Sequence, residues 1–191
     1  MNPSEFDKAM MDLSRAIEIE LPIINEKMAL NAYAMMKDRI INEGTIGDGK
    51  SLGNYSDNKL PAFYFDGKSS NKGGDKLLAK ELNKENKGEG ISYKQWRQAN
   101  NRPTDHVTLS FTGTTLNDIG VTKKVIEGGR VVTTVGPKNT KQRSNGKSTE
   151  EIAGYLTDQY GDILQPSTEE KEILQRFFDA EIQKIISKFI K

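Results

Sequence analysis

Two β-rich runs separated by glycines constrain this chain more than any other feature. Residues 121–126 and 130–135 are rich in valine, isoleucine and threonine, which favour extended backbone. A Glu-Gly-Gly tripeptide at 127–129 separates them, and glycine accepts the positive φ that a tight hairpin turn requires. The pattern therefore predicts an antiparallel hairpin with strands at about 121–126 and 130–136.

A third strand is predicted just before the hairpin, at about 106–113. In this run, HVTLSFTG, the apolar Val107, Leu109 and Phe111 alternate with polar residues, which is the period of a half-buried strand. A small sheet with one apolar face needs helices to cover it. We therefore expect an α+β fold in which helices pack on a small antiparallel sheet.

The N-terminal part of the chain supplies one such helix. Apolar residues recur at three- and four-residue spacing from Leu13 to Met28, and the pattern continues to Gly44, a residue type that favours a helix C-terminal cap. Its methionines are typical of a core, or of an adhesive partner surface. Pro22 cannot donate a main-chain hydrogen bond, so this long helix should be kinked or split there.

Two further helices are predicted near the C-terminus. Ser148 with Glu151, and Ser167 with Glu170, have the spacing of a capping box, which marks a helix N-terminus. The first helix should stop before Gly161. The second carries a wide stripe of isoleucine, leucine and phenylalanine, which indicates that one broad side is buried.

Residues 44–90 have a different composition, dense in Gly, Asn, Ser and Lys. The motifs LPAFYF and LLAKEL are the only apolar patterns able to order this stretch. We interpret it as a long flexible insertion, or arm, within a single domain of residues 1–191. It is either a mobile, solvated segment or a segment that a neighbouring subunit orders.

The segment after the arm holds the only tryptophan. Tyr93 and Trp96 are spaced to share one helix face, with Arg97 beside them. This group predicts either an aromatic-basic surface for bases or a partner, or two aromatics that fix the arm to the core. His106 is the only histidine and has no companion cluster of ligands, so no metal site is expected.

A basic loop follows the hairpin. Lys138, Lys141, Arg143 and Lys147 occur there with no acidic residue among them. The loop is either a contact for phosphate or an acidic partner, or a solvated tip.

Composition excludes several classes of protein. The 191 residues carry a formal net charge of +1 and no cysteine, so no disulfide, catalytic thiolate or thiolate metal site is present. No apolar run approaches the ~20 residues of a spanning helix, and the N-terminus lacks a signal-peptide pattern. No phosphate loop, nucleophile elbow or metal-binding helix motif appears. We expect a soluble, cytoplasmically made protein that is not an enzyme and has no catalytic residues, cofactor or membrane contact.

Three stretches resemble a known family. TIGDGKSLGNYSD (45–57) has a Gly-x-Tyr-Ser core that includes Tyr55, and YKQWRQANNRPTDHVTLSFTGTTLNDI (93–119) ends in a hydrophobic run and a Thr-Gly-x-x-Leu turn. EEIAGYLTDQYGDILQPSTEEKEILQRFFDAEI (150–182) has a short helix, a turn at Tyr160 and Gly161, a proline and a last helix. Together they are similar to the tail-completion and neck proteins of tailed bacteriophages, the virion-morphogenesis family. Where that family often has Pro-Ala-Arg-Pro-Phe after the turn glycine, residues 162–166 read DILQP, which keeps a proline and lacks the arginine.

The resemblance implies a structural virion protein at the tail or the head–tail junction, made in the host cytoplasm. Its partners would be further copies in a homo-oligomeric ring, other virion proteins (portal, adaptor, tail tube or terminator) and, without sequence specificity, packaged DNA. Residues expected to bind partners are Tyr55, Trp96, Arg97, Lys138, Lys141, Arg143, Lys147 and Tyr160. The alternative is a nucleic-acid-binding accessory protein that uses the aromatic-basic surface.

Overall fold

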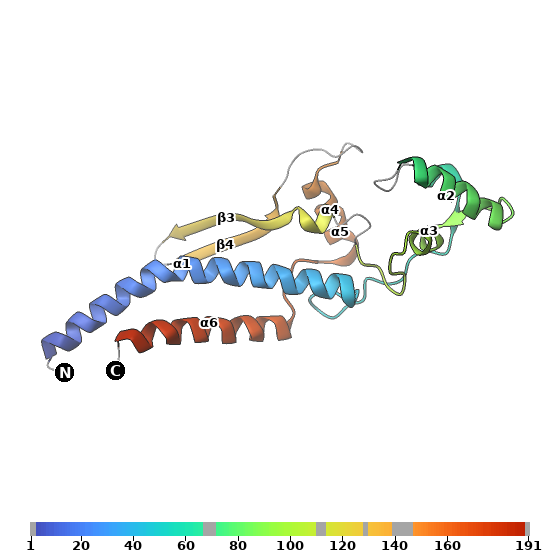
Figure 1. Ribbon diagram of the computed structural model, residues 1–191. Coiled ribbons are helices and arrows are strands. Elements are labelled where there is room, and N and C mark those ends of the chain that lie inside the picture. Colours follow the sequence, from blue (N-terminus) through green and yellow to red (C-terminus); the bar gives the residue numbers. More distant parts are fainter. Residues whose placement is uncertain (1–2, 67–71, 110–113, 128–129, 139–146, 190–191) are drawn as a thin grey trace. The chain divides into compact units, whose positions relative to one another are not determined.

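The computed structural model describes residues 3–66, 72–109, 114–127, 130–138 and 147–189 (Figure 1). Over these residues the fold is α+β, as predicted, with long helices and two small antiparallel sheets. In chain order the elements are α1 (Pro3–Asn42), β1 (Lys59–Leu60), the 3-10 helix η1 (Ala62–Phe65), α2 (Lys72–Glu85), β2 (Ile91–Ser92), α3 (Tyr93–Ala99), α4 (Thr114–Asn117), β3 (Ile119–Glu127), β4 (Arg130–Pro137), α5 (Thr149–Tyr160) and α6 (Thr168–Phe189).

The chain divides into two compact units. Unit 1 takes its described residues from 1–37 and 118–191, and unit 2 takes its own from 38–117. Helix α1 begins in unit 1 and ends in unit 2. The expectation of a single domain over residues 1–191 stays a prediction.

In unit 1, α1 packs along α6 through the predicted apolar stripes. Leu13 and Ile24 of α1 are buried together with Ile185 of α6, and Phe177 and Phe178 pack on them partly buried. Figure 1 shows the unit 1 part of α1 lying between α6, which runs antiparallel to it, and the β3–β4 hairpin. The helix continues through Pro22 and is bent rather than split.

The hairpin is formed as predicted and is longer by one or two residues at its base. β3 and β4 pair antiparallel from Ile119↔Pro137 to Glu127↔Arg130, with an irregularity in register between Val121 and Lys123. Two contacts join the hairpin to α1. Asn25 Nδ2 donates to the Val131 carbonyl at 3.3 Å, and Lys124 pairs with Glu26 at 3.1 Å. One of these contacts comes from each strand, and Figure 1 shows β4 nearer to α1 than β3.

The strand predicted at 106–113 is not formed over residues 106–109, and residues 110–113 lie outside the described part. Val107 and Thr108 are both buried, so the segment does not alternate between an inner and an outer face. The Val107 and Thr108 amides donate to the Gly53 carbonyl and the Tyr55 hydroxyl, at 2.8 and 3.0 Å. Leu109 has φ of +50°, which also interrupts extended backbone. The alternating pattern does not produce a strand here, because hydrogen bonds to distant residues engage the amides of both Val107 and Thr108.

Unit 2 is built from the segment predicted as a flexible arm. The two apolar motifs order it: LPAFYF forms β1 and η1, and LLAKEL lies within α2. Phe65, Ala79, Ile91 and Trp96 form a buried cluster. β1 pairs with β2 through Leu60↔Ile91, which joins the two ends of the arm. The described parts of 44–90 thus belong to a folded unit, because few but well-placed apolar residues bury one another.

Helix ends follow the predicted signals. Ser148 and Glu151 form a complete capping box at α5, and Ser167 and Glu170 exchange the same pair of hydrogen bonds at α6. Gly44, just past α1, and Gly161, just past α5, have φ of +63° and +94°, which is backbone that glycine adopts without strain.

Candidate functional site

The structure separates the predicted partner-binding residues into two groups and does not bring them together in one unit. Unit 2 holds Tyr55, Trp96 and Arg97, and unit 1 holds Lys138, Lys147 and Tyr160. Lys141 and Arg143 lie outside the described residues.

Arg97 is a buried residue and not part of a surface. Only 1% of it is exposed. Its Nε donates to the Pro103 carbonyl at 3.0 Å, and its Nη2 donates to Thr108 Oγ1 at 3.1 Å. Its guanidinium carbon lies 4.3 Å from the centre of the Tyr55 ring. Burying a charge is tolerable only when its donors are satisfied, so Arg97 fastens three segments of unit 2 together.

Two tyrosines complete this arginine cluster. The Tyr55 hydroxyl lies 3.1 Å from Thr108 Oγ1, and the rings of Tyr55 and Tyr93 are 5.6 Å apart. Burial raises the pKa of the Tyr93 hydroxyl, although its hydrogen bond with Arg97 and the arginine charge act in the opposite direction. Tyr55, in the Gly-x-Tyr-Ser core, therefore makes its contacts within unit 2 and is half-buried.

Trp96 is fully buried, with its ring 5.2 Å from that of Phe65. Its indole nitrogen finds no hydrogen-bond partner among the described residues. The predicted aromatic-basic surface was wrong for Trp96 and Arg97. The other interpretation, that the aromatic residues fix the arm, agrees with this packing.

The basic loop, residues 138–147, has two anchored ends in unit 1. The Lys138 amide donates to the Asp118 carbonyl at 2.6 Å, and Thr149 Oγ1 donates to the Asp118 carboxylate at 2.9 Å. Asp118 therefore holds the start of the loop and the start of α5 close together. Sequence reasoning missed Asp118, because no local pattern distinguishes an anchoring aspartate from a solvated one.

The basic side chains at the two ends of this loop are exposed. Lys147 Nζ lies 4.2 Å from the centre of the Tyr155 ring, a cation–π contact on the surface of α5. The Lys138 side chain lies over Gly120, where an added Cβ would come within 1.9 Å of it. Tyr160, at the C-terminal end of α5, is half-buried. Lys138 and Lys147 are thus positioned for contact with a partner, whereas Tyr160 is mainly part of the turn.

His106 has a structural role. Its Nε2 lies 2.8 Å from the Ile41 carbonyl, and its Nδ1 lies 3.2 Å from the Asp105 carboxylate. A Cβ on Gly44 would come within 2.4 Å of the imidazole, so this ring closes over the end of α1. No group of three or more potential metal ligands occurs among the described residues.

An open apolar face on α1 is the other surface that the sequence did not single out. Ile19, Ile23 and Leu30 are 68%, 45% and 46% exposed. They are four and seven residues apart, and they lie six residues after Leu13, Ile17 and Ile24 of the face that packs on α6. At about 3.6 residues per turn, six residues place the open face about 120° around α1 from the centre of the α6 contact. Ile19, at its edge, borders a pocket that Ile185 and Phe189 of α6 also line.

No protein-family model, curated protein or solved structure matches the chain. Among the described residues, no helix has both the length and the apolar character needed to cross a membrane.

Proposed function

We propose that the chain is a structural virion protein of a tailed phage, a ring subunit at the head–tail junction or the tail-completion site. The observation that carries the proposal is the open apolar face of α1. Three large aliphatic side chains spaced four and seven residues apart form the kind of seam that a second helix covers. The resemblance of residues 45–57, 93–119 and 150–182 to tail-completion and neck proteins supports the same role.

Assembly, and not catalysis, is the proposed mechanism. The packed α1–α6 pair and the hairpin make a stiff scaffold, and the open face meets a neighbouring copy. The exposed Lys138 and Lys147, at the two ends of the basic loop, contact a further virion protein or packaged DNA. Weak contacts of this kind gain strength in a ring, because every subunit repeats them.

The test is the molecular mass of the purified full chain without nucleic acid, measured by sedimentation and native mass spectrometry. The parent should form one closed species larger than a dimer. Changing Ile19, Ile23 and Leu30 to Gln together should yield folded monomers with the parent's circular dichroism spectrum, because these side chains are exposed in the single chain. A parent that stays monomeric at every concentration contradicts the proposal.

The matched control changes Leu77, Ile126 and Ile173 to Gln. These residues are 64%, 62% and 41% exposed and belong to α2, β3 and α6, not to α1. The control should keep the parent's mass. Equal dissociation of both variants would show that exposed apolar area in general, and not the α1 face, holds the oligomer.

The alternative proposal is a nucleic-acid-binding accessory protein. The aromatic part of the surface that this alternative requires loses support, because Trp96 is buried. A salt-sensitive affinity of the monomer for DNA, without self-association, would favour this alternative.

A further inference from the structure

Helix α2 of unit 2 carries a lysine stripe, defined here as Lys76, Lys80 and Lys84. The three follow four-residue spacing, so they lie on one face of the helix, about 6 Å apart along its axis. All are exposed, and Lys87 follows just beyond the helix. The opposite face, with Leu78 and Leu82, packs on the buried cluster of Phe65 and Trp96.

This arrangement is locally unfavourable for the helix. Like charges four residues apart repel, and the stripe contains two such pairs, Lys76–Lys80 and Lys80–Lys84. Glu81 and Glu85 form a third like-charged pair on the neighbouring face. Exchanging Lys80 with Glu81 would place a glutamate between the two remaining lysines. A sequence that breaks a local rule without evident gain in stability marks a functional position.

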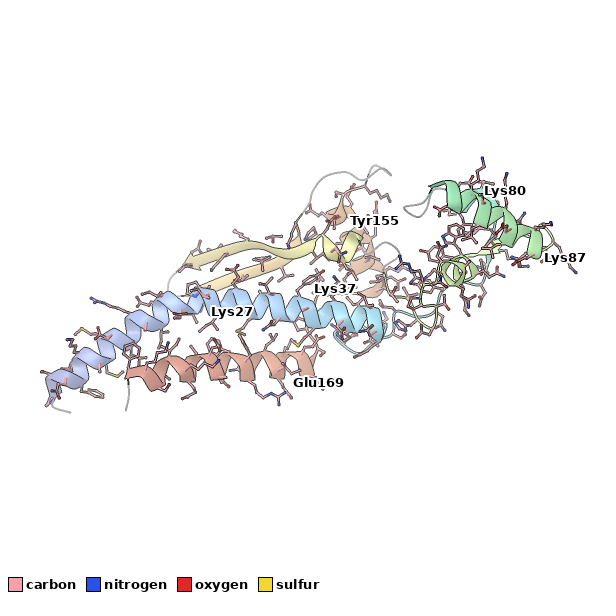
Figure 2. The ribbon with its side chains drawn as sticks, in the orientation of Figure 1. Lys27, Lys37, Lys80, Lys87, Tyr155 and Glu169 are labelled. Carbon is pink, nitrogen blue, oxygen red and sulfur yellow. The ribbon has the colours of Figure 1, made fainter. Side chains whose placement is uncertain are left out.

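The lysines are also available. Within the described residues, neither a salt bridge nor a side-chain hydrogen bond engages Lys76, Lys80 or Lys84. Figure 2 shows the labelled side chains of Lys80 and Lys87 projecting outward from the α2 region. The stripe therefore presents three lysines to solvent, with Glu81 and Glu85 on the neighbouring face.

We infer that the lysine stripe binds the phosphate backbone of duplex DNA without reading its sequence. A row of ammonium groups at regular spacing suits a regular line of phosphates, and lysine interacts as a point charge without the planar geometry that arginine requires. A membrane surface fits less well, because the apolar face of α2 is used inside unit 2 and Leu77 is its only large exposed apolar side chain among those described.

This inference goes beyond the proposed ring and does not depend on it. It assigns DNA contact to unit 2, whereas sequence reasoning assigned it to the basic loop or to Trp96 and Arg97. A ring that binds no DNA, and a DNA-binding monomer, are separate outcomes of separate experiments.

The experiment titrates the full chain with a fluorescent mixed-sequence duplex at several salt concentrations. The parent should bind at low salt, with log affinity falling linearly against log salt. Changing Lys76, Lys80 and Lys84 to Gln should lower the magnitude of that slope by about 2.7, at ~0.9 for each lost phosphate contact. Glutamine keeps the helix propensity, and relief of the repulsion should leave the melting temperature equal or higher.

A control variant changes Lys171, Lys184 and Lys188 to Gln, which removes the same charge from exposed positions of α6. Of these three, Lys184 is paired with Glu181. This control should keep most of the parent's slope of log affinity against log salt. The inference is overturned if the parent does not bind DNA at low salt, if the α2 variant binds like the parent, or if the α6 control loses as much. Binding to poly-glutamate but not to DNA would assign the stripe to an acidic protein and overturn it equally.

Discussion

Units 1 and 2 are stabilised in different ways. Unit 1 depends on long apolar stripes, with Leu13 and Ile24 of α1 packed against α6. Unit 2 has a small apolar cluster around Trp96, and beside it a buried arginine that donates to Pro103 and Thr108 and lies on the Tyr55 ring. The comparison teaches that a lysine- and glycine-rich segment can fold without a broad core. A few large buried side chains and one buried, hydrogen-bonded arginine take its place.

The largest effect should come from the apolar centre of unit 2. Changing Trp96 to Ala removes a fully buried indole and should lower the free energy of unfolding by about 3–5 kcal/mol. No hydrogen bond to a described residue is lost, since the indole nitrogen has none. Urea denaturation followed by circular dichroism measures the loss. An unchanged midpoint would mean that Trp96 is not buried in solution.

Two neighbouring residues of α1 test the difference between its buried face and its open face. Ile24 is 2% exposed and Ile23 is 45% exposed. Ile24→Ala should cost about 2–4 kcal/mol by leaving a cavity against α6, whereas Ile23→Ala should cost below about 1 kcal/mol. Thermal melts of the two variants at one concentration test this. Equal losses would show that the two faces of α1 are wrongly assigned.

Arg97→Lys tests the polar part of unit 2. Lysine keeps the charge, but it cannot reach Pro103 and Thr108 together while lying on the Tyr55 ring. The expected loss is about 2–3 kcal/mol, from buried acceptors left unsatisfied. Arg102→Lys, at an exposed position, is the control and should change stability by less than about 0.5 kcal/mol. Similar melting temperatures for both variants would show that the contacts of Arg97 do not stabilise unit 2.

The smallest effect on stability should come from the basic loop. Changing Lys138, Lys141, Arg143 and Lys147 to Ser removes, among the described residues, the exposed cation–π contact of Lys147 with Tyr155, worth at most about 1 kcal/mol. The melting temperature should therefore barely move, while assembly into infectious particles should fall. The variant should also keep the parent's salt slope for DNA. Loss of DNA binding in this variant would move the DNA contact from α2 back to the loop.

These comparisons explain what could be predicted from the sequence. Unit 1 follows periodic patterns: apolar spacing in α1 and α6, capping boxes, and a glycine turn between β3 and β4. Each of these is a local cause, readable from neighbouring residues.

The structure of unit 2 depends on contacts that local patterns do not encode. Val107 and Phe111 have a strand's alternation, yet Val107 and Thr108 are held by Gly53 and Tyr55, which precede them by more than 50 residues. The burial of Arg97 likewise depends on Pro103 and Thr108. Charged residues are usually exposed, so sequence reasoning placed Arg97 on the surface.

Amide hydrogen exchange on the dilute, isolated chain tests most directly whether unit 2 is folded by its own contacts. Dilution to the monomer removes any neighbour that could order residues 44–90. The structure predicts slow exchange at the β1–β2 pair and in α3, including the amides of Ile91 and Arg97. Exchange throughout 44–109 at the rate of an unfolded chain, with protection kept in α1 and α6, would contradict it and return this segment to an arm ordered only by assembly.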